Sequence, residues 1–426
     1  MLTRSLLARK AQDVESMTTS RARSVVRGPA SQQCAVADGN IGSSLTESGL
    51  LESVAGRPRS DRPEHRLRAA AGREGKSRTM ILRSTAYARV GLMGNPSDGY
   101  YGKTLAFLVR NFSVTVTVWE SPLLSIIPHP AHDPTAFDSL DELTEVARRD
   151  GYYGGVRLLF ATCKKFSEYC GTHGLRIPRE NFTIAYETNA PRQVGLGGSS
   201  AIIVAALKSL MGFYGLTDED IPKPVQPSLA LSVELEELDI VAGLQDRVVQ
   251  VYGGLVYMDF DREIMKQQGH GGYETLDIHL LPRLALAYVP EPKDSGKTHS
   301  DVRYRFDRGD REVVEAMRTF AQYAEAGREA LEQGDHDRLG DLMNRNFDLR
   351  RQVYGDAAIG AKNLEMIELA RSFGMPAKFC GSGGAIVMIC DDDDLFARAQ
   401  VAFLERGFIM MRAEPANRGC WGNGPC

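Results

Sequence analysis

The segment Pro191–Ala201, with the sequence PRQVGLGGSSA, places three glycines and two serines at the start of an apolar run. Glycines allow the backbone to approach a ligand closely, and the first turn of a helix presents free N–H groups and the positive end of the helix dipole. A strand-like stretch, Asn181–Thr188, precedes the segment, and apolar residues follow it at helical spacing over Ala201–Tyr214. This pattern predicts an anion site that suits phosphate. An ordinary helix start after a flexible turn is the alternative.

Two further glycine-rich turns carry polar side chains. The first, GLMGNPSD at Gly91–Asp98, follows a short apolar strand, so its polar residues are candidates for holding a hydroxylated ligand. The second, GSGG at Gly381–Gly384, follows Lys378 and separates a short strand from an apolar one. A plain turn is the alternative for the first, and a hairpin or bulge is the alternative for the second.

Two familiar nucleotide-binding motifs are excluded by their spacing. The GKT triplets at 102–104 and 296–298 lack the glycine that a P-loop requires five positions upstream, where Ser97 and Glu291 stand instead. The GLG at 195–197 is followed by Ser200 at the third glycine position of a dinucleotide fingerprint. Neither a P-loop fold nor a Rossmann fold is therefore indicated.

Acidic residues are candidates for catalysis or for holding a cation. Asp246 ends the mostly apolar stretch Ala242–Asp246, where an unpaired charge would be costly, so it either has a chemical role or pairs with the adjacent Arg247. The acidic run Glu234–Glu237 is either a solvated helix face or a source of a metal ligand. The run Asp391–Asp394 indicates a solvated turn and helix start rather than a metal site.

Strands and helices must position these residues, and hydrophobic periodicity predicts both kinds of element. We expect strands at 88–94, 112–119, 181–188, 253–260, 284–289 and 385–390, and helices at 155–169, 201–214, 228–238, 311–334, 335–353, 358–373 and 393–406. The elements mix without regular βαβ alternation, which favours an α+β fold over a doubly wound sheet.

Composition limits the class of protein. The 426 residues are 43% hydrophobic and 25% charged, which is ordinary globular composition for two or three domains. The net charge of −4 argues against general nucleic-acid binding, and no apolar run is long enough to span a membrane. Seven cysteines form no CxxC pair, which fits a reducing compartment and offers no zinc site.

The first 79 residues differ from the rest of the chain. They hold 14 Lys and Arg against 8 Asp and Glu, lack Phe, Tyr and Trp, and show no sustained helical or strand period. We therefore expect a disordered extension, with order beginning near residue 86. The extension is either an organelle transit peptide, or a plain tail or upstream sequence before a true start at Met80.

The three glycine turns, in this order and spacing, resemble the GHMP kinase superfamily (galactose, homoserine, mevalonate and phosphomevalonate kinases) from about residue 86 to about residue 412. The resemblance implies a two-domain α+β fold. Its parts would be an N-terminal ribosomal-protein-S5-like, ATP-binding domain at 86–283 and a C-terminal ferredoxin-like domain with an α/β plait at 284–415. An extension at 1–85 and a tail at 416–426 complete the predicted organisation.

Within that superfamily the sequence is most similar to the glucuronokinase family. The stretches that carry this likeness are PRQVGLGGSSA (191–201), GNPSDGYYGKT (94–104), GYYGGVRLL (151–159), VAGLQDRVVQVYGG (241–254), DSGKTHS (294–300) and KFCGSGGA (378–385). One departure is Cys380, at a position where the family leads us to expect threonine.

The resemblance implies an ATP-dependent kinase that phosphorylates the anomeric hydroxyl of D-glucuronate, giving glucuronate 1-phosphate and ADP for UDP-glucuronate synthesis. The alternatives are a kinase for another sugar, of the heptose phosphate, fucose or galactose type, and a non-catalytic regulator that keeps the ligand site. The presence of Ser200, Glu234 and Asp246 argues against the regulator. We expect ATP and a small sugar acid as ligands, no nucleic-acid or membrane partner, a plausible monomer, and a cytoplasmic location unless residues 1–79 target a plastid or mitochondrion.

The resemblance also implies roles for individual residues. Asp246 is the expected catalytic carboxylate, and Mg²⁺ is the expected cofactor, held by Ser200 and by Glu234, with Glu237 as the alternative to Glu234. Glu234 lies twelve residues before Asp246, the separation that the family leads us to expect.

The remaining expected contacts are with ATP and with the sugar. The ATP contacts are Pro191, Gly195, Leu196, Gly197, Gly198, Ser199, Ser200, Ala201, Gly381, Ser382 and Gly383. The sugar hydroxyls would be held by Asn95, Ser97 and Asp98. A sugar carboxylate needs a cation, for which Arg192, Lys297 and Arg89 are the candidates.

Overall fold

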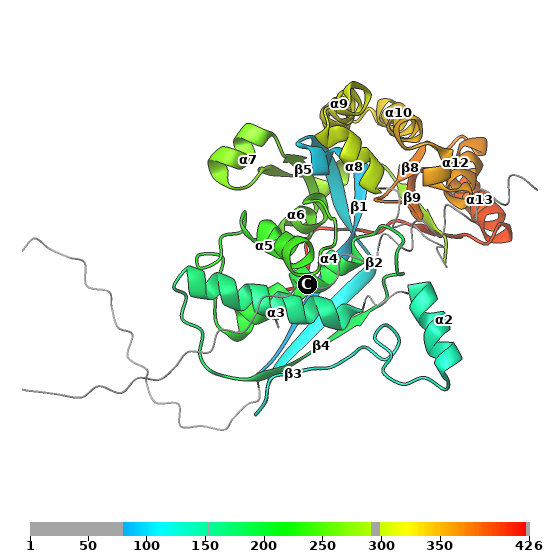
Figure 1. Ribbon diagram of the computed structural model, residues 1–426. Coiled ribbons are helices and arrows are strands. Elements are labelled where there is room, and N and C mark those ends of the chain that lie inside the picture. The colour runs from blue at the N-terminus through cyan, green and yellow to red at the C-terminus, as the bar shows by residue number, and fades with distance from the viewer. Residues whose placement is uncertain (1–79, 151–153, 291–298, 423–426) are drawn as a thin grey trace, which may run out of the picture. The chain divides into compact units, whose positions relative to one another are not determined.

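The computed structural model describes residues 80–150, 154–290 and 299–422, and these form two β-sheets with accompanying helices (Figure 1). The predicted extension at 1–79 and the candidate Lys297 lie outside the described residues. The first sheet has seven strands: β1 (Ile81–Met93), β2 (Lys103–Glu120), β3 (Ser125–Ile126), β4 (Phe182–Thr188), β5 (Leu255–Asp259), β6 (Gly272–Leu276) and β11 (Pro415–Ala416).

The long strand β2 organises the first sheet. It pairs antiparallel with β1 along most of its length, with β5 through its first residues and with β4 through its last. The β1–β2 register breaks between Tyr87 and Ala88 and again between Gly91 and Met93. Such irregularities bend a strand and re-aim its side chains, so the second half of β1 is directed differently from the first.

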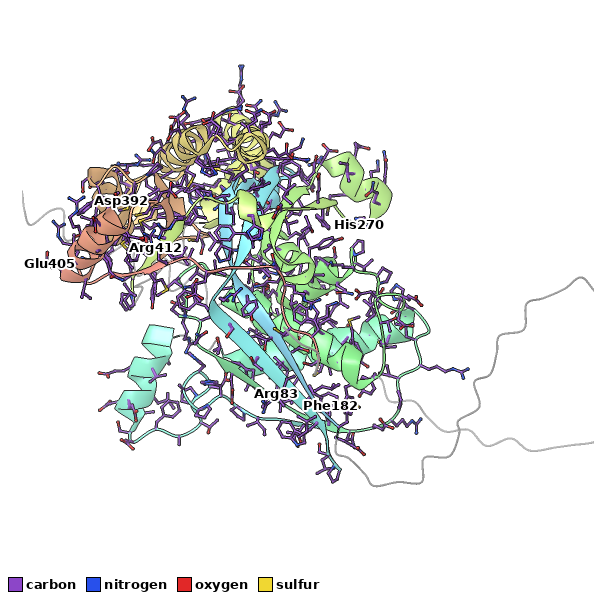
Figure 2. All side chains as sticks on the ribbon, turned by 180° about the vertical axis from the view of Figure 1, so that it is seen from behind. Arg83, Phe182, His270, Asp392, Glu405 and Arg412 are labelled. Carbon is purple, nitrogen blue, oxygen red and sulfur yellow. The ribbon has the colours of Figure 1, made fainter. Side chains whose placement is uncertain are left out.

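Helices complete this part of the chain: η1 (Ser97–Tyr100), α2 (Leu140–Asp150), α3 (Gly155–Thr172), α4 (Gly198–Phe213), α5 (Gln226–Ser232), the π-helical turn η2 (Val233–Glu237), α6 (Gln245–Tyr252), α7 (Arg262–Gln268) and η3 (Ile278–Leu280). Helix α4 is apolar on nearly all sides because it packs between the sheet and α3. Phe182, at the start of β4, belongs to this core (Figure 2).

The second sheet contains β7 (Leu284–Tyr288), β8 (Ala377–Phe379), β9 (Ala385–Ile389) and β10 (Ile409–Arg412), in the order β10-β7-β9-β8 with antiparallel neighbours. Its helices are α8 (His299–Asp307), α9 (Arg311–Gln333), α10 (His336–Tyr354), α11 (Asp356–Ile359), α12 (Ala361–Ser372) and α13 (Asp393–Glu405). The succession of strands with helices after the first and third is the expected ferredoxin-like arrangement.

Helices α9 and α10 pack against strands of both sheets. Asp310 and Asp335 cap their first turns, and Gly334 takes the left-handed conformation that ends α9. Their apolar faces join β1 and β2 to β7 and β9 in one hydrophobic core, and α10 also contacts β8. Polar residues of α10 can therefore reach turns that belong to either sheet.

The predicted α+β fold is confirmed, and most predicted strands and helices are present. The structure also contains elements that were not predicted, among them β6, β10, α2 and α8, and β2 begins at Lys103 rather than at residue 112. The helix expected over 228–238 is divided into α5 and the wider π turn η2, β1 already begins at Ile81, and Cys420 pairs with Thr85 through two backbone hydrogen bonds in the stretch expected to be a tail. The wider turn and the returning chain depend on contacts far along the sequence, which local periodicity does not encode.

The Asp391–Asp394 run starts α13, as its composition indicates. Asp392 caps the helix through its side chain, and Arg412 donates to the Asp392 carbonyl (Figure 2). Among the described residues no cluster of three or more His, Cys, Asp or Glu could hold a metal ion. Within the same residues, none of the helices has the length and apolar character needed to cross a bilayer. Cys163, Cys170, Cys380 and Cys390 are free thiols, whereas Cys420 is disulfide-bonded, which the spacing of the cysteines did not predict.

Candidate active site

The three glycine turns, far apart in the sequence, meet beside the second half of β1. The backbone N–H of Arg89 donates to the Leu196 carbonyl at 2.9 Å, and the N–H of Gly91 donates to the Cys380 carbonyl at 2.8 Å. A Cβ atom at Gly195 would lie 2.6 Å from the Gly383 carbonyl oxygen, so the turns touch where a side chain could not fit. The contact between turns thus requires glycine at this position.

Arg89 holds these turns and a carboxylate at the same time. Its Nη1 donates to the carbonyls of Cys380 at 2.7 Å and Gly195 at 3.0 Å, and its Nη2 bonds to Asp246 Oδ2 at 2.5 Å. The side chain is 5% exposed, so this ion pair has little screening by water. Arg89 was a candidate for binding the sugar carboxylate, but its terminal nitrogens are already bound to partners within the protein.

Asp246 lies in the first turn of α6, beside the start of α4. A Cβ atom at Gly197 would lie 3.3 Å from Asp246 Oδ2 and 3.2 Å from Ser200 Oγ, so the carboxylate and the hydroxyl flank the same glycine. Only Oδ2 takes part in the bond to Arg89. Oδ1 is therefore left for a ligand, since it accepts no hydrogen bond from the described residues.

The turn before α4 has the open geometry of an anion site. Gly195 and Gly197 have φ angles of 69° and 73°, and the helix starts without a side-chain cap. Its first N–H groups consequently lack intrahelical partners. The Gly197 carbonyl accepts from Ser200 Oγ and from Gln250 Nε2, both at 2.9 Å, whereas Ser199 is exposed.

Other residues predicted to bind ATP at this turn serve the fold through their side chains. Leu196 and Ala201 are buried in the hydrophobic cores on either side of the turn. Pro191 is half-buried at its start, and Gly198 is the first residue of α4. These positions can contribute backbone groups to a ligand, but their side chains pack or are absent.

The acidic residues pair differently from the sequence-based alternatives. Arg247 forms a buried ion pair with Glu234, and its nearest approach to Asp246 Oδ2 is 3.8 Å. Burial and the nearby Arg89 cation lower the pKa of Arg247 to about 9. Glu237 instead turns outward to Lys164, whose Nζ lies 2.6 Å from its carboxylate. The pairing of Asp246 with Arg247, which the sequence left open, is therefore present only as the longer contact of 3.8 Å, since the shorter ion pair of Asp246 is with Arg89 at 2.5 Å.

Asp98 is the candidate for sugar binding that faces the catalytic region. It lies in η1, and its Oδ2 accepts from the N–H of Gln245, next to Asp246, at 3.3 Å. Burial, followed by the charge of Asp246, raises the pKa of Asp98 to about 6. A carboxyl group poised near neutrality and close to a second carboxylate is typical of a functional site.

Asn95 and Ser97 lie in the same turn but point elsewhere. Asn95 is buried, and its Oδ1 accepts from Lys378 Nζ at 2.6 Å. Ser97 is buried too, and its hydroxyl donates to the Lys103 carbonyl at 2.9 Å, which closes the turn. Both side chains therefore shape the turn that presents Asp98, rather than facing Asp246.

Lys378 and two residues of α10 belong to the site, although the sequence did not single them out. Lys378 Nζ, fully buried, donates also to the Gly91 and Phe379 carbonyls, and burial lowers its pKa to about 7. Asn346 accepts from the N–H of Gly94, and Arg350 donates to the turn after β8. Polar residues on the apolar face of a predicted amphipathic helix were the available signal for the two α10 residues.

The sequence and structure place the chain in a known family. Residues 157–254 match the GHMP kinases N terminal domain, and residues 328–408 match the GHMP kinases C terminal domain. The structure is similar to Lactococcus lactis galactokinase complexed with galactose, with a TM-score of 0.61, 14% identity, and coverage of 80% of this chain and 95% of that one. The chain belongs to the GHMP kinase family.

Curated relatives narrow the class further. The chain is 50% identical to the probable glucuronokinase 2 of Arabidopsis thaliana over 336 residues, which cover 78% of this chain and 90% of the relative. It is 49% identical to glucuronokinase 1 of the same plant, over 77% of this chain and 89% of the relative. The protein is therefore a sugar kinase of the glucuronokinase type, a phosphotransferase that acts on a hydroxyl and uses ATP.

Proposed function

We propose that this kinase transfers the γ-phosphoryl group of ATP to the anomeric hydroxyl of D-glucuronate, giving glucuronate 1-phosphate and ADP. The observation that carries the proposal is the position of Asp246, whose carboxylate lies beside the open helix start at Gly197. If the phosphates of ATP bind at that helix start, the γ-phosphoryl group lies close to a hydroxyl held by Asp246. The identity to relatives named glucuronokinases supports the choice of sugar.

In the proposed reaction, Asp246 Oδ1 accepts the proton of the anomeric hydroxyl as the sugar oxygen forms its bond to the γ-phosphorus. The bond between the γ-phosphorus and the β,γ-bridging oxygen breaks, and its electron pair leaves with ADP. Arg89 keeps Asp246 in place through Oδ2, so the free oxygen is directed by a rigid pair. Because phosphoryl transfer has a loose transition state, alignment and charge neutralisation contribute most of the acceleration.

The phosphates would be bound by the N–H groups at the start of α4 and by the neighbouring turn at Gly381–Gly383. Ser200 Oγ donates to the Gly197 carbonyl, so its lone pairs remain for a cation. Ser200 and Glu234 offer the hard oxygen ligands that Mg²⁺ prefers, and Glu234 would have to share its charge between the ion and Arg247. Bound with ATP, Mg²⁺ supplies charge neutralisation to the phosphates.

The sugar would lie between Asp246 and Asp98, which can accept hydrogen bonds from its hydroxyls. Its carboxylate requires a cation, and of the three candidates Arg89 is committed to Asp246. Arg192, half-buried at the start of the phosphate turn, remains the candidate among the described residues.

A panel of sugars tests the proposal directly. Purified full-length protein is incubated with ATP, Mg²⁺ and either glucuronate, galacturonate, glucose, galactose, fucose or a heptose phosphate, and ADP release is measured. We expect glucuronate to have the highest kcat/KM, and phosphorus NMR to place the product phosphate on C1. Higher kcat/KM with a neutral sugar or a sugar phosphate would refute the assignment, and no turnover with any sugar would favour the regulator.

Asp246→Asn tests the catalytic role. The substitution keeps an oxygen that can accept from Arg89 but removes the charge and the proton affinity, so turnover should fall at least about a hundredfold. It also leaves a buried guanidinium without its anion, so the free energy of unfolding should fall by about 1–3 kcal/mol, less than for complete loss of a buried partner. Loss of stability with nearly normal turnover would assign Asp246 to holding Arg89 instead.

A further inference from the structure

Arg350 of α10 reaches the turn that joins β8 to β9. Its Nη1 donates to the Gly381 carbonyl at 2.7 Å, and its Nη2 donates to the Ser382 carbonyl at 3.0 Å. The residue is 4% exposed, and its guanidinium lies 5.2 Å from the ring centroid of Tyr354 and 5.1 Å from that of Phe379. Two rings and two carbonyls therefore fix the plane of the guanidinium.

This burial is costly for a charged group, and no carboxylate of the described residues forms an ion pair with Arg350 that would offset it. Burial lowers the pKa of the guanidinium as a consequence. An apolar side chain would complete the core of α10 at lower cost. The two hydrogen bonds to the turn are thus the contribution that is particular to arginine.

A second buried arginine holds the preceding peptide group of the same turn. Arg89 donates to the Cys380 carbonyl, so the three consecutive carbonyls of Cys380, Gly381 and Ser382 are all bound by arginine side chains. In a trans peptide the N–H points opposite to the C=O of the same group. The partner N–H groups belong to Gly381, Ser382 and Gly383, and none of them donates a hydrogen bond to a described residue.

Three successive N–H groups that donate to none of the described residues are available to an anion. The turn after β8 touches the turn before α4 at Gly195. A Cβ atom at Gly195 would lie 3.0 Å from Ser382 N and 3.1 Å from Gly383 N. An anion bound at the start of α4 is therefore within reach of both turns. Gly381 and Gly383 are buried, so their N–H groups have limited access to solvent and gain from such a ligand.

We propose that Arg350 is a positioning residue, which holds the Gly381 and Ser382 carbonyls so that the N–H groups of Ser382 and Gly383 face the terminal phosphates of ATP. The proposal rests on ATP binding at these turns, as in the proposed function, but not on the identity of the sugar. Arg350 itself would touch neither ATP nor sugar. Its effect should therefore appear in phosphate affinity and should grow with the number of phosphates.

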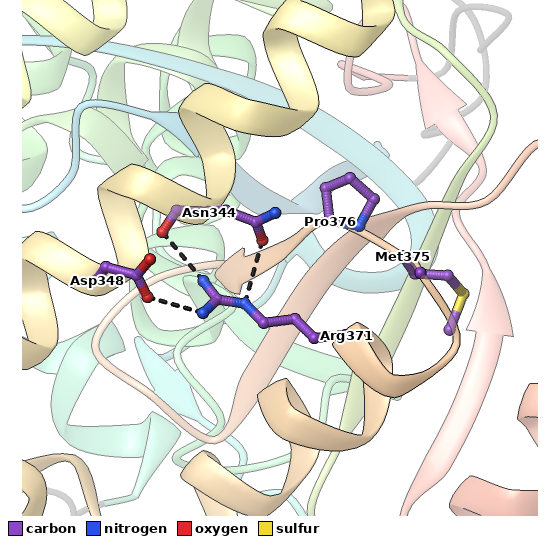
Figure 3. Close-up of a pocket in the computed structure, with 6 residues that line it drawn as sticks. Asn344, Asp348, Arg371, Met375 and Pro376 are labelled. Carbon is purple, nitrogen blue, oxygen red and sulfur yellow. Dashed lines mark hydrogen bonds and ion pairs between the residues drawn. The ribbon is translucent and has the colours of Figure 1, made fainter.

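The experiment compares Arg350→Met with Arg371→Met in the full chain. Arg371 is a matched control because it also ties a helix to α10, through Asn344 and Asp348 (Figure 3). It lies over the Phe347 ring, and none of its hydrogen bonds with described residues reaches a glycine turn. Calorimetry without sugar measures the dissociation constants of AMP, ADP and a non-hydrolysable ATP analogue. Urea unfolding monitors the stability of both variants.

We expect Arg350→Met to raise the dissociation constant of the ATP analogue at least about tenfold and that of AMP much less. Arg371→Met should leave the dissociation constants of all three nucleotides unchanged. Arg350→Lys should lie between, because a point donor cannot hold both carbonyls. In Arg350→Ala, added guanidinium should restore part of the affinity for the analogue. These results would stand even if the sugar panel refuted glucuronate.

Two results would overturn the proposal. If Arg350→Met weakened the binding of AMP and of the ATP analogue equally, or changed neither affinity, Arg350 would not orient the phosphate turn. Unchanged nucleotide affinity with a raised KM for glucuronate alone would show that Arg350 instead recognises the sugar acid. If Arg350→Met fails to fold, the Arg350→Lys series and the guanidinium titration provide the same comparison.

Discussion

Asp98→Asn should stabilise the protein at neutral pH while impairing sugar phosphorylation. Burial and the neighbouring Asp246 raise the pKa of Asp98 from its ordinary 3.8 to about 6. Between these values the folded protein holds more protons than the unfolded chain, so the free energy of unfolding falls as the pH rises from about 4 to about 6. The Asp98→Asn variant lacks this titration and keeps an oxygen that can accept from the Gln245 N–H.

The magnitude follows from the two pKa values. Their difference lowers the free energy of unfolding of the wild type by at most about 3 kcal/mol at pH 7.5. At pH 4.5 the loss is about 1 kcal/mol, because Asp98 is then largely ionised in the unfolded chain but not in the folded protein. The variant should therefore gain about 2 kcal/mol over wild type between pH 4.5 and pH 7.5. Asp98 is half-buried, and solvent screening makes these figures upper limits.

Urea unfolding of the two proteins at pH 4.5, 5.5, 6.5 and 7.5 measures this difference directly. Groups that titrate alike in both proteins cancel in this difference. A difference between the Asp98→Asn variant and wild type that does not change with pH, or that shrinks as the pH rises, would refute the reasoning. The same variant should have a raised KM for the sugar, with ATP affinity nearly unchanged.

Other predictions concern the glycine turn, the metal and the extension. Gly195→Ala should raise the KM for ATP several-fold and lower the free energy of unfolding by about 2 kcal/mol or more. Gly215 has the same φ of 69° but open space around it, so Gly215→Ala should show only the backbone strain of about 1–2 kcal/mol. Equal losses of stability in urea unfolding would contradict the steric argument. Ser200→Ala should raise the Mg²⁺ concentration needed for half-maximal turnover more than the KM for the sugar, and unchanged metal dependence would reject Ser200 as a ligand. Deleting residues 1–79 should leave turnover and melting temperature nearly intact, since β1 begins at Ile81, and loss of either would show that the extension takes part in the fold.

Relations between distant residues account for what the sequence analysis missed. Lys378 and Asn95 are 283 positions apart, and Arg350 and Gly381 are 31 apart on separate elements. No local periodicity links such pairs, and their contact depends on α10 packing between the two sheets. From the sequence alone, Asn346 and Arg350 are therefore indistinguishable from other polar residues of an amphipathic helix.

The sequence by itself determined the local chemistry of this protein. A glycine-rich turn before an apolar helix indicates free N–H groups whatever surrounds it, because positive φ and helix starts depend on a few adjacent residues. The same holds for α9 and α10, whose caps and apolar periodicity are contained in their own residues. The order and spacing of the three turns then sufficed to indicate the kinase family.

Only the tertiary structure decided which charges pair. Arg247 adjoins Asp246 in the sequence, but successive side chains on a helix point about 100° apart, and Arg247 turns to Glu234. Asp246 meets Arg89, which is 157 residues away, because the irregular second half of β1 aims that side chain at the start of α6. Ion pairing depends on distance and burial in space, and those are properties of the packed sheets and helices rather than of neighbouring positions in the chain.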